Sequence, residues 1–223
     1  MQGRKLASII DHTLLRATAT EADIEKLCWE ARVHGFGTVC IQPCFVKLAA
    51  ALLEGTAVKV ATVIGFPLGA TTSEIKAEEA QQAVENGAQE LDLVLNIGAL
   101  KEKRFEYVLA DLKGVIERAG EARVKVIMET CYLTDDEIIK ACQLAVAAGA
   151  EFVKTSTGFG PAGAKLEQVQ LMRQTVGPGI GVKAAGGISC YEDAIAMIKA
   201  GANRIGASAG IKIIKGKVKT GCS

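Results

Sequence analysis

The stretch "AGAEFVKTSTG", residues 148–158, joins the end of a predicted helix to a predicted buried strand. At the helix end Gly149 can adopt the left-handed conformation that closes a helix, and a short loop then leads into the apolar run that begins at Phe152. The same kind of junction occurs three more times, in segments that begin at His34, Asn86 and Ala200. This recurrence predicts a chain in which helices and strands alternate.

The spacing of these junctions predicts the number of strands. The junction glycines lie 52, 62 and 52 residues apart, which is about twice the ~30 residues of one strand-and-helix unit. These glycines are Gly35, Gly87, Gly149 and Gly201. One more strand is therefore expected between each pair, and suitable apolar runs begin at Val58, Arg123 and Gly179. With "SIIDHTLL" at residues 8–15, the sequence contains eight predicted strands.

Helices are expected in the segments between the strands. Their predicted ranges are 21–33, 73–86, 103–119, 134–148, 164–175 and 190–200. Two of them have clear start signals, because Thr72 or Ser73 precedes Glu74 and Thr134 precedes three acidic residues. In such starts a hydroxyl caps the first turn, and carboxylates lie at the positive end of the helix dipole.

The predicted strands are nearly continuous apolar runs, which is typical of parallel strands buried on both faces. Eight such strands alternating with helices predict an α/β fold, a (β/α)8 TIM barrel. We expect one domain over residues 1–223, with a short N-terminal helical extension. A doubly wound open sheet is the alternative. It normally has a glycine-containing phosphate loop after its first strand, and "DHTLLRAT" at 11–18 contains no glycine.

Composition argues against several classes of protein. Of the 223 residues 49% are hydrophobic and 23% charged, with a formal net charge of +1 and no block of five like charges, so we expect neither a nucleic-acid nor a membrane partner. No segment reaches the ~18 continuous apolar residues of a spanning helix. The seven cysteines lack C-x-x-C spacing, which favours reduced thiols in a cytoplasmic protein. The lysine-rich segment 211–222 is interpreted as a terminal helix with a solvated face.

Four charged residues lie in predicted strands that are otherwise apolar. They are Asp11, Asp92, Lys154 and Lys183. Side chains alternate along a strand, so Asp92 shares a face with Glu90, and Leu91 and Leu93 lie on the opposite face. By the same rule both lysines lie opposite the large aliphatic residues of their strands. We therefore expect Asp92 and the two lysines to point into the barrel mouth, where the active sites of such barrels lie.

Two lysines and a carboxylate in one barrel mouth favour chemistry on an amine. A lysine with an ordinary pKa of ~10.4 is almost fully protonated at pH 7. A second cation and an apolar wall lower the pKa and leave an amine that can form a Schiff base with a carbonyl substrate. A nearby carboxylate can then move protons through a water molecule. A structural Lys–Asp–Lys ion cluster would use the same residues, so both interpretations stay open at this point.

Glycine turns follow three of the predicted strands. They are "STGFG" after Lys154, "AAGGIS" after Lys183 and "IGASAG" in the eighth strand and its loop. Glycines let the backbone approach an anion, and barrels often bind phosphate in the loops after strands seven and eight. Together the three turns predict a phosphorylated substrate.

Several segments resemble the deoxyribose-phosphate aldolase family of class I aldolases over essentially the whole chain. They are "IIDHTLL", "ELDLVLNIG", "KVIMET", "EFVKTSTGFG", "GVKAAGGI" and "RIGASAG". The resemblance implies reversible cleavage of 2-deoxy-D-ribose 5-phosphate to acetaldehyde and D-glyceraldehyde 3-phosphate in deoxynucleoside catabolism. It also implies a homodimer or homotetramer, no cofactor and no metal. Lys154 matches the Schiff-base lysine, Lys183 the second lysine that perturbs it, and Asp92 the proton-transfer carboxylate.

The resemblance also implies how the substrate is held. Asp11 and Thr13 match polar residues that line the site, and Cys40 matches a cysteine beside it that we interpret as packing. The residues that match the phosphate site are Gly158, Gly186, Gly187, Gly206 and Ser208.

The chain departs from the family pattern at two places. It has Phe159 where some members have lysine, and it ends in "KTGCS" where some end in a tyrosine-terminated tail that closes over the site. We therefore expect backbone groups and Ser208 to hold the phosphate, and Asp92 with water to carry the protons.

Other functions are compatible with the same residues. A phosphosugar isomerase or epimerase on this barrel would need a carboxylate or histidine base at a strand end, and His12 is the histidine near one. Another Schiff-base enzyme would use the same lysine. A non-catalytic protein that binds a phosphate ligand would keep the glycines and tolerate the loss of Lys154.

Overall fold

The computed structural model describes residues 3–216 and contains eight parallel strands that close into a barrel in chain order. The strands are β1 Ile10–Leu14, β2 Thr38–Ile41, β3 Lys59–Ile64, β4 Glu90–Val94, β5 Arg123–Ile127, β6 Phe152–Lys154, β7 Gly181–Ala185 and β8 Arg204–Ala207. Closure comes from β8 pairing with β1, where Asp11 lies in register with Gly206. The predicted (β/α)8 barrel is confirmed, and the open-sheet alternative is wrong because the sheet has no free edge.

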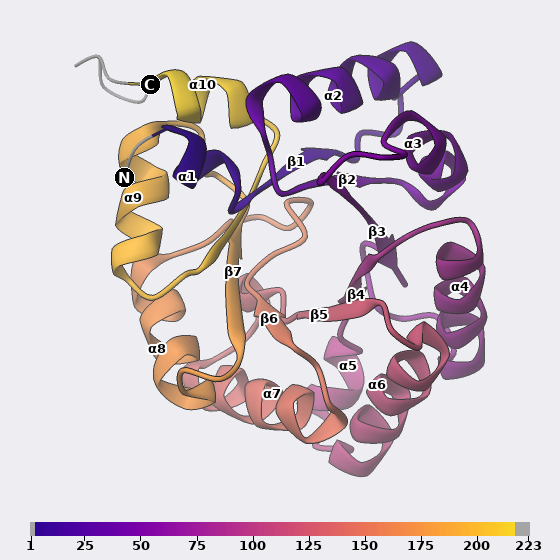
Figure 1. Cartoon of the computed structure of the whole chain (residues 1–223). Helices are drawn as coiled ribbons and strands as arrows, with labels where there is room; N and C mark the ends of the chain where they lie inside the picture. Colours follow the sequence, from indigo (N-terminus) through magenta and orange to yellow (C-terminus); the bar gives the residue numbers. More distant parts are fainter. Residues whose placement is uncertain (1–2, 217–223) are drawn as a thin grey trace.

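Helices form an outer ring around the strands (Figure 1). They are α1 Gly3–Ala7, α2 Glu21–His34, α3 Val46–Leu52, α4 Ser73–Glu85, α5 Ile97–Lys101, α6 Phe105–Ala119, α7 Asp135–Ala148, α8 Leu166–Val176, α9 Tyr191–Lys199 and α10 Gly210–Lys215. The six predicted helices are all present, with ends that differ from the prediction by two residues or fewer. The expected N-terminal helical extension is α1, which lies beside α10 (Figure 1).

The helix ends follow the signals in the sequence. Thr20 and Thr134 each form a capping box, in which the hydroxyl accepts from the backbone of the third helical residue and that residue's carboxylate accepts from the cap backbone. At the other end Gly35 and Gly149 take left-handed φ values of 69° and 99°. These glycines stop a helix and turn the chain back into the next strand.

Two short helices were not predicted. Helix α3 begins directly after a 3-10 turn at Pro43–Phe45, and α5 begins at the Asn96 cap. Each is too short to show a helical period in the sequence. The terminal helix was expected over 211–222, and α10 occupies its first part. The rest of that segment and the "KTGCS" tail lie outside the described residues.

The strands separate an aliphatic layer from a charged interior. Leu91, Leu93 and Val153 belong to the main hydrophobic core between barrel and helices. On the opposite face of the same strands Glu90, Asp92 and Lys154 are buried inside the barrel. The alternation predicted from the sequence is therefore present, and it places the ionisable side chains inside the barrel.

A buried ion pair joins two of the outer helices to a strand end. Lys76 of α4 donates to the carboxylate of Asp111 in α6 at 2.8 Å and to the carbonyl of Val94, the last residue of β4, at 3.2 Å. Both side chains are fully buried. Gly65 leaves room for the stem of Lys76, because a Cβ there would lie 3.0 Å from Lys76 Cε.

Most of the described cysteines are free thiols, as expected. These are Cys28, Cys40, Cys44, Cys131 and Cys142. The expectation of reduced thiols is wrong for Cys190, which is disulfide-bonded, and Cys222 lies outside the described residues. Within residues 3–216 we find no helix with the length and apolar character needed to span a membrane.

Candidate active site

Parallel pairing sets the predicted charged residues beside one another. Lys154, the last residue of β6, is in register with Lys183 of β7, and residues in register on neighbouring strands point to the same face. Asp92 of β4 is likewise in register with Lys125 of β5. The closed barrel then brings these side chains together in one interior. Lys154 ends its strand, and the other three residues are the middle residues of theirs.

Asp92 is the centre of the cluster. Its Oδ2 atom lies 2.7 Å from the Nζ atoms of both Lys154 and Lys183, and its Oδ1 atom lies 2.8 Å from Nζ of Lys125. Burial by itself would raise the pKa of this carboxyl, but the three neighbouring lysines outweigh it and hold the pKa well below its usual range. Asp92 is therefore an anion shared by three amines.

Burial and neighbouring charges shift the pKa values of Lys154 and Lys183 in opposite directions. Burial lowers the pKa of Lys154, and the positive charge of Lys183 lowers it further, although Asp92 acts in the opposite direction. Burial also acts against the charge of Lys183, but the carboxylates of Asp11 and Asp92 raise its pKa above the usual value. Lys154 consequently loses its proton first, while Lys183 remains a cation.

Asp11 completes this arrangement from the other side of the barrel. Its carboxylate accepts from Lys183 and, at 2.8 Å, from Nη1 of Arg204. Burial would raise the pKa of Asp11, but Lys183, Lys125 and Arg204 lower it below the usual range. Asp11 therefore fixes Lys183 in its charged form and does not face the substrate cavity itself.

Among the largely buried groups of this cluster the charges balance when Lys154 is neutral. The buried or largely buried cationic groups are Lys125, Lys154, Lys183 and Arg204, and the carboxylates in contact with them are Asp11, Glu90 and Asp92. Arg123 and Lys59 also approach Glu90, but their side chains are partly exposed to solvent. With every group ionised the cluster carries one excess positive charge, and loss of a proton from Lys154 removes it. A buried excess charge is unfavourable, so the composition of the cluster favours the neutral amine.

Sequence reasoning missed three members of this cluster. Lys125 contacts Asp92 and lies 2.7 Å from Glu90, and Arg204 contacts both Asp11 and Glu90. Lys125 is a charge in an apolar strand, which is the signal used for Lys154, so the same criterion would have found it. Glu90 was placed on the face of Asp92 without a role.

A cavity of about 600 Å³ opens above Lys154. The residues assigned to the phosphate site all line it, together with Thr13 and Lys154. These residues are Gly158, Gly186, Gly187, Gly206 and Ser208. Asp92, Lys183 and Asp11 lie below Lys154 and do not line the cavity. The site thus has a charged floor, one amine at that floor and a rim of glycine turns.

The glycines of the rim are required by geometry. Gly158, Gly186 and Gly187 have φ values of 88°, 84° and 78°, a region that other residues rarely adopt. Gly206 serves a different purpose, because a Cβ there would lie 2.9 Å from Lys183 Cε. Gly206, which was assigned to phosphate binding, therefore also leaves the space that the Lys183 side chain occupies.

Glu129 is a further residue of the site that the sequence did not reveal. It is buried, and its φ of 51° is left-handed, which is uncommon for a side chain of this size. Its carboxylate accepts from the backbone N–H of Thr157 at 3.3 Å and from the Thr157 hydroxyl. It thereby anchors the turn that begins at Gly158. Strained backbone of this kind is found preferentially at functional sites.

Cys40 lies inside the barrel as expected for a packing residue. Its Sγ atom is 3.9 Å from Asp92 Oδ2, and burial together with the charge of Asp92 raises the pKa of this thiol to about 11. The thiol is therefore protonated at neutral pH, which agrees with packing and not with nucleophilic chemistry.

His12 does not occupy the position that an isomerase base would need. Its ring stacks on Phe36 outside the barrel and contacts Glu30 at 2.7 Å. It does not line the cavity above Lys154, and no carboxylate of the described residues lines that cavity either. The geometry therefore gives no support to an isomerase or epimerase at this site.

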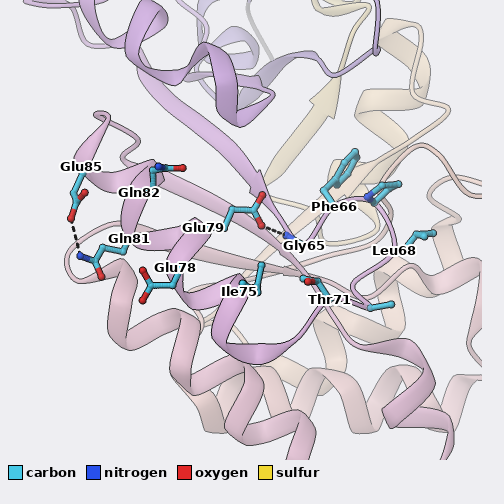
Figure 2. Close-up of a pocket in the computed structure, with 12 residues that line it drawn as sticks. Gly65, Phe66, Leu68, Thr71, Ile75, Glu78, Glu79, Gln81, Gln82 and Glu85 are labelled. Carbon is cyan, nitrogen blue, oxygen red and sulfur yellow. Dashed lines mark hydrogen bonds between the residues drawn. The ribbon is translucent and has the colours of Figure 1, made fainter.

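A larger cavity of about 740 Å³ lies on the outer surface, between α4 and the loop that follows β3. Figure 2 shows its lining, in which Glu79 accepts from the backbone of Gly65 at 2.7 Å and Gln81 contacts Glu85 at 2.8 Å. The described residues that line it include neither a lysine nor a cysteine. Size alone therefore does not identify the reactive site.

Known proteins resemble this chain along nearly its full length. The model of the DeoC/LacD family of aldolases matches residues 5–216. A deoxyribose-phosphate aldolase of Carboxydothermus hydrogenoformans is 60% identical over 218 residues, covering 96% of each chain. One from Streptococcus uberis is 58% identical over 217 residues, covering 97% of this chain and 99% of that one. The tetrameric deoxyribose phosphate aldolase of Aeropyrum pernix matches with a TM-score of 0.91 at 37% identity, covering 96% and 91%.

Proposed function

The chain belongs to the DeoC/LacD family of aldolases, and on this premise we propose that it cleaves 2-deoxy-D-ribose 5-phosphate through a Schiff base on Lys154. Its activity is that of a deoxyribose-phosphate aldolase, a carbon–carbon lyase, as in the relatives at 60% and 58% identity. One observation supports the role of Lys154 above all. It is a buried amine with a lowered pKa at the floor of a cavity rimmed by glycine turns.

The first half of the proposed reaction breaks the carbon–carbon bond. Neutral Nζ of Lys154 attacks the C1 aldehyde of the open-chain sugar, and uptake of one proton from water with loss of one water molecule leaves a protonated imine. The C2–C3 bond then breaks, and its electron pair moves toward the iminium nitrogen to form an enamine. The C3 hydroxyl loses its proton, and D-glyceraldehyde 3-phosphate leaves.

The second half releases acetaldehyde. The enamine carbon C2 takes up a proton, which restores the imine, and water hydrolyses that imine to acetaldehyde and free Lys154. Asp92, 2.7 Å from Lys154 Nζ, relays these protons through a water molecule. Because its lysine partners hold Asp92 in the ionised form, it passes protons on and does not store them. Lys183 keeps Lys154 neutral by its fixed charge.

The phosphate end of the substrate lies at the glycine rim in this proposal. Backbone N–H groups near Gly186 and Gly187 and the hydroxyl of Ser208 line the cavity there. Glycine allows such a backbone to approach the phosphate oxygens closely. With the phosphate on C5 held at this rim, the proposal places C1, at the other end of the sugar, against the amine of Lys154.

The cellular setting is also part of the proposal. We place the enzyme in the cytoplasm, in the catabolism of deoxynucleosides, as a homodimer or homotetramer. The tetrameric relative from Aeropyrum pernix supports such an assembly. Light scattering of the purified protein measures the assembly directly.

Borohydride trapping tests residue, mechanism and substrate class together. Incubation with 2-deoxy-D-ribose 5-phosphate or acetaldehyde and sodium borohydride should leave a reduced adduct on Lys154, found by peptide mass mapping. Loss of activity should follow the extent of labelling. Absence of an adduct at Lys154 during active turnover would defeat the Schiff-base mechanism.

A substitution of Lys154 separates an enzyme from a binding protein. Lys154→Leu should abolish cleavage while the fold and binding of inorganic phosphate persist, because the glycine rim does not depend on the amine. Retained cleavage would exclude Lys154 as the nucleophile. The matched control is Lys140→Leu, since Lys140 is a lysine of the outer helix α7.

A further inference from the structure

The substrate cavity contains an arginine to which the mechanism above assigns no role. Of the described residues that line it, only Lys154 and Arg16 have side chains that carry charge. Lys154 must be neutral to act as a nucleophile, and Lys183 lies below the cavity floor. A phosphate dianion would therefore meet a single permanent positive charge, that of Arg16.

Arg16 lies where the first strand's loop passes the phosphate rim. The cavity above Lys154 and a neighbouring cavity of about 510 Å³ both include Arg16 and Ser208 in their linings. Phe159, which follows the turn at Gly158, provides an apolar wall and no charge. Arg16 is thus the charged group next to the Ser208 corner of the rim.

The guanidinium of Arg16 is held by a partner that it can leave. Its Nη2 atom lies 2.7 Å from Oδ2 of Asp23, and about half of the Arg16 side chain is exposed. Exposed ion pairs contribute little stability, so exchange of Asp23 for a phosphate is not opposed by a strong contact. Asp23 also accepts from Thr20 as part of the α2 cap, so it stays in place when Arg16 moves.

We propose that Arg16 is a specificity-determining residue, whose guanidinium binds the 5-phosphate of the substrate and leaves Asp23 when it does so. The planar fork of arginine matches two phosphate oxygens at once. This inference rests on the proposed function, because it takes the 5-phosphate to lie at the glycine rim.

Kinetics on two sugars test the proposal. The ratio of kcat/KM for 2-deoxy-D-ribose 5-phosphate to that for 2-deoxy-D-ribose should fall at least about tenfold in Arg16→Gln, since a charge-assisted bond to phosphate is lost. The change should be mainly in KM for the phosphorylated sugar, and Arg16→Lys should recover part of the ratio. An unchanged ratio in Arg16→Gln would overturn the proposal.

Two controls separate the alternatives. Arg118→Gln removes an equally exposed arginine that pairs with Glu78 on the outer helices, and it should leave the ratio unchanged; an equal fall there would also overturn the proposal. Inorganic phosphate titrated into Lys154→Leu should bind at least about tenfold more tightly than into Lys154→Leu/Arg16→Gln. That binding result does not need turnover, so failure of the aldolase mechanism and failure of the Arg16 proposal give different outcomes.

Discussion

Asp92 determines the ionisation of the residues around it, because one carboxylate contacts three lysines. Its effect on Lys154 opposes catalysis in one respect, since a negative charge at 2.7 Å favours the protonated amine. In the proposed mechanism its contribution to the reaction lies in moving protons. Asp92 therefore disfavours the neutral amine but favours proton transfer, and these two effects on the reaction can be measured separately.

The Asp92→Asn variant should separate them. Removing the negative charge lowers the pKa of Lys154 further, so the pH midpoint of borohydride trapping should move to lower pH. Turnover should nevertheless fall by about 10² or more, because the proton relay is gone. Trapping rates across pH and kcat measure the two effects, with circular dichroism to check the fold. A midpoint that moved to higher pH would contradict this account of the site.

The loops that follow β5 and β6 contact each other through Glu129. It follows β5, yet its carboxylate holds Thr157 in the loop after β6. The loop backbones are also joined, since Thr130 N–H donates to the carbonyl of Thr155 at 2.9 Å. The turn at Gly158, which lines the cavity, is therefore anchored by a residue that does not line the cavity itself.

Two substitutions of Glu129 distinguish its carboxylate from its strained backbone. Glu129→Ala and Glu129→Gly should both raise KM for the phosphorylated sugar several-fold, because both release Thr157. Glu129→Gly should be the more stable by about 1 kcal/mol, since glycine adopts a φ of 51° without strain. Steady-state kinetics and urea unfolding measure these effects. If either variant kept the KM of the unsubstituted protein, the Gly158 turn would keep its conformation without the Glu129 carboxylate.

The buried ion pair of Lys76 and Asp111 in the helix layer allows a prediction about stability. Lys76→Met leaves a buried carboxylate without its cation and should lower the free energy of unfolding by about 3–5 kcal/mol. The double variant Lys76→Met/Asp111→Leu should recover much of that loss, because it removes the buried charge. Urea unfolding measures both. Equal losses in the single and double variants would mean that packing, and not charge, sets the cost.

Much of this element layout could be predicted from the sequence, because glycine junctions, caps and apolar runs are local signals. Lys125 and Arg204 were missed because their roles depend on contacts between strands. Arg204 meets Asp11 across a separation of 193 residues, through the closure of β8 on β1. Alternation within a strand gives the face of a side chain but not its partner. The left-handed Glu129 had no signal, since glutamate does not favour that conformation.

At the scale of the whole barrel the charges act as one group. Four largely buried cations and three buried carboxylates contact one another in an interior closed by all eight strands. The lowering of the Lys154 pKa is therefore a property of the enclosed set and not of Lys183 alone. Removing any other cation should bring the proton back to Lys154.

Lys125→Met tests this collective effect. Asp92 would lose one of its three cations, so it should attract the proton of Lys154 more strongly and raise the pKa of that amine. Turnover at neutral pH should fall, and the trapping midpoint should move to higher pH. Lys125→Arg, which keeps the positive charge, is the matched control. An unchanged midpoint in Lys125→Met would confine the control of Lys154 to its direct neighbours.

The contact between Gly206 and Lys183 restricts how the enzyme can be engineered. A designer who wants to accept bulkier or unphosphorylated aldehydes would be drawn to the small residues of the rim. A side chain at 206 would displace the Cε atom of Lys183 and so disturb the amine while trying to alter the pocket. Position 187 has free space around an added Cβ, and asparagine tolerates its left-handed backbone. Libraries that vary 187 and preserve 206 should change substrate range without displacing Lys183.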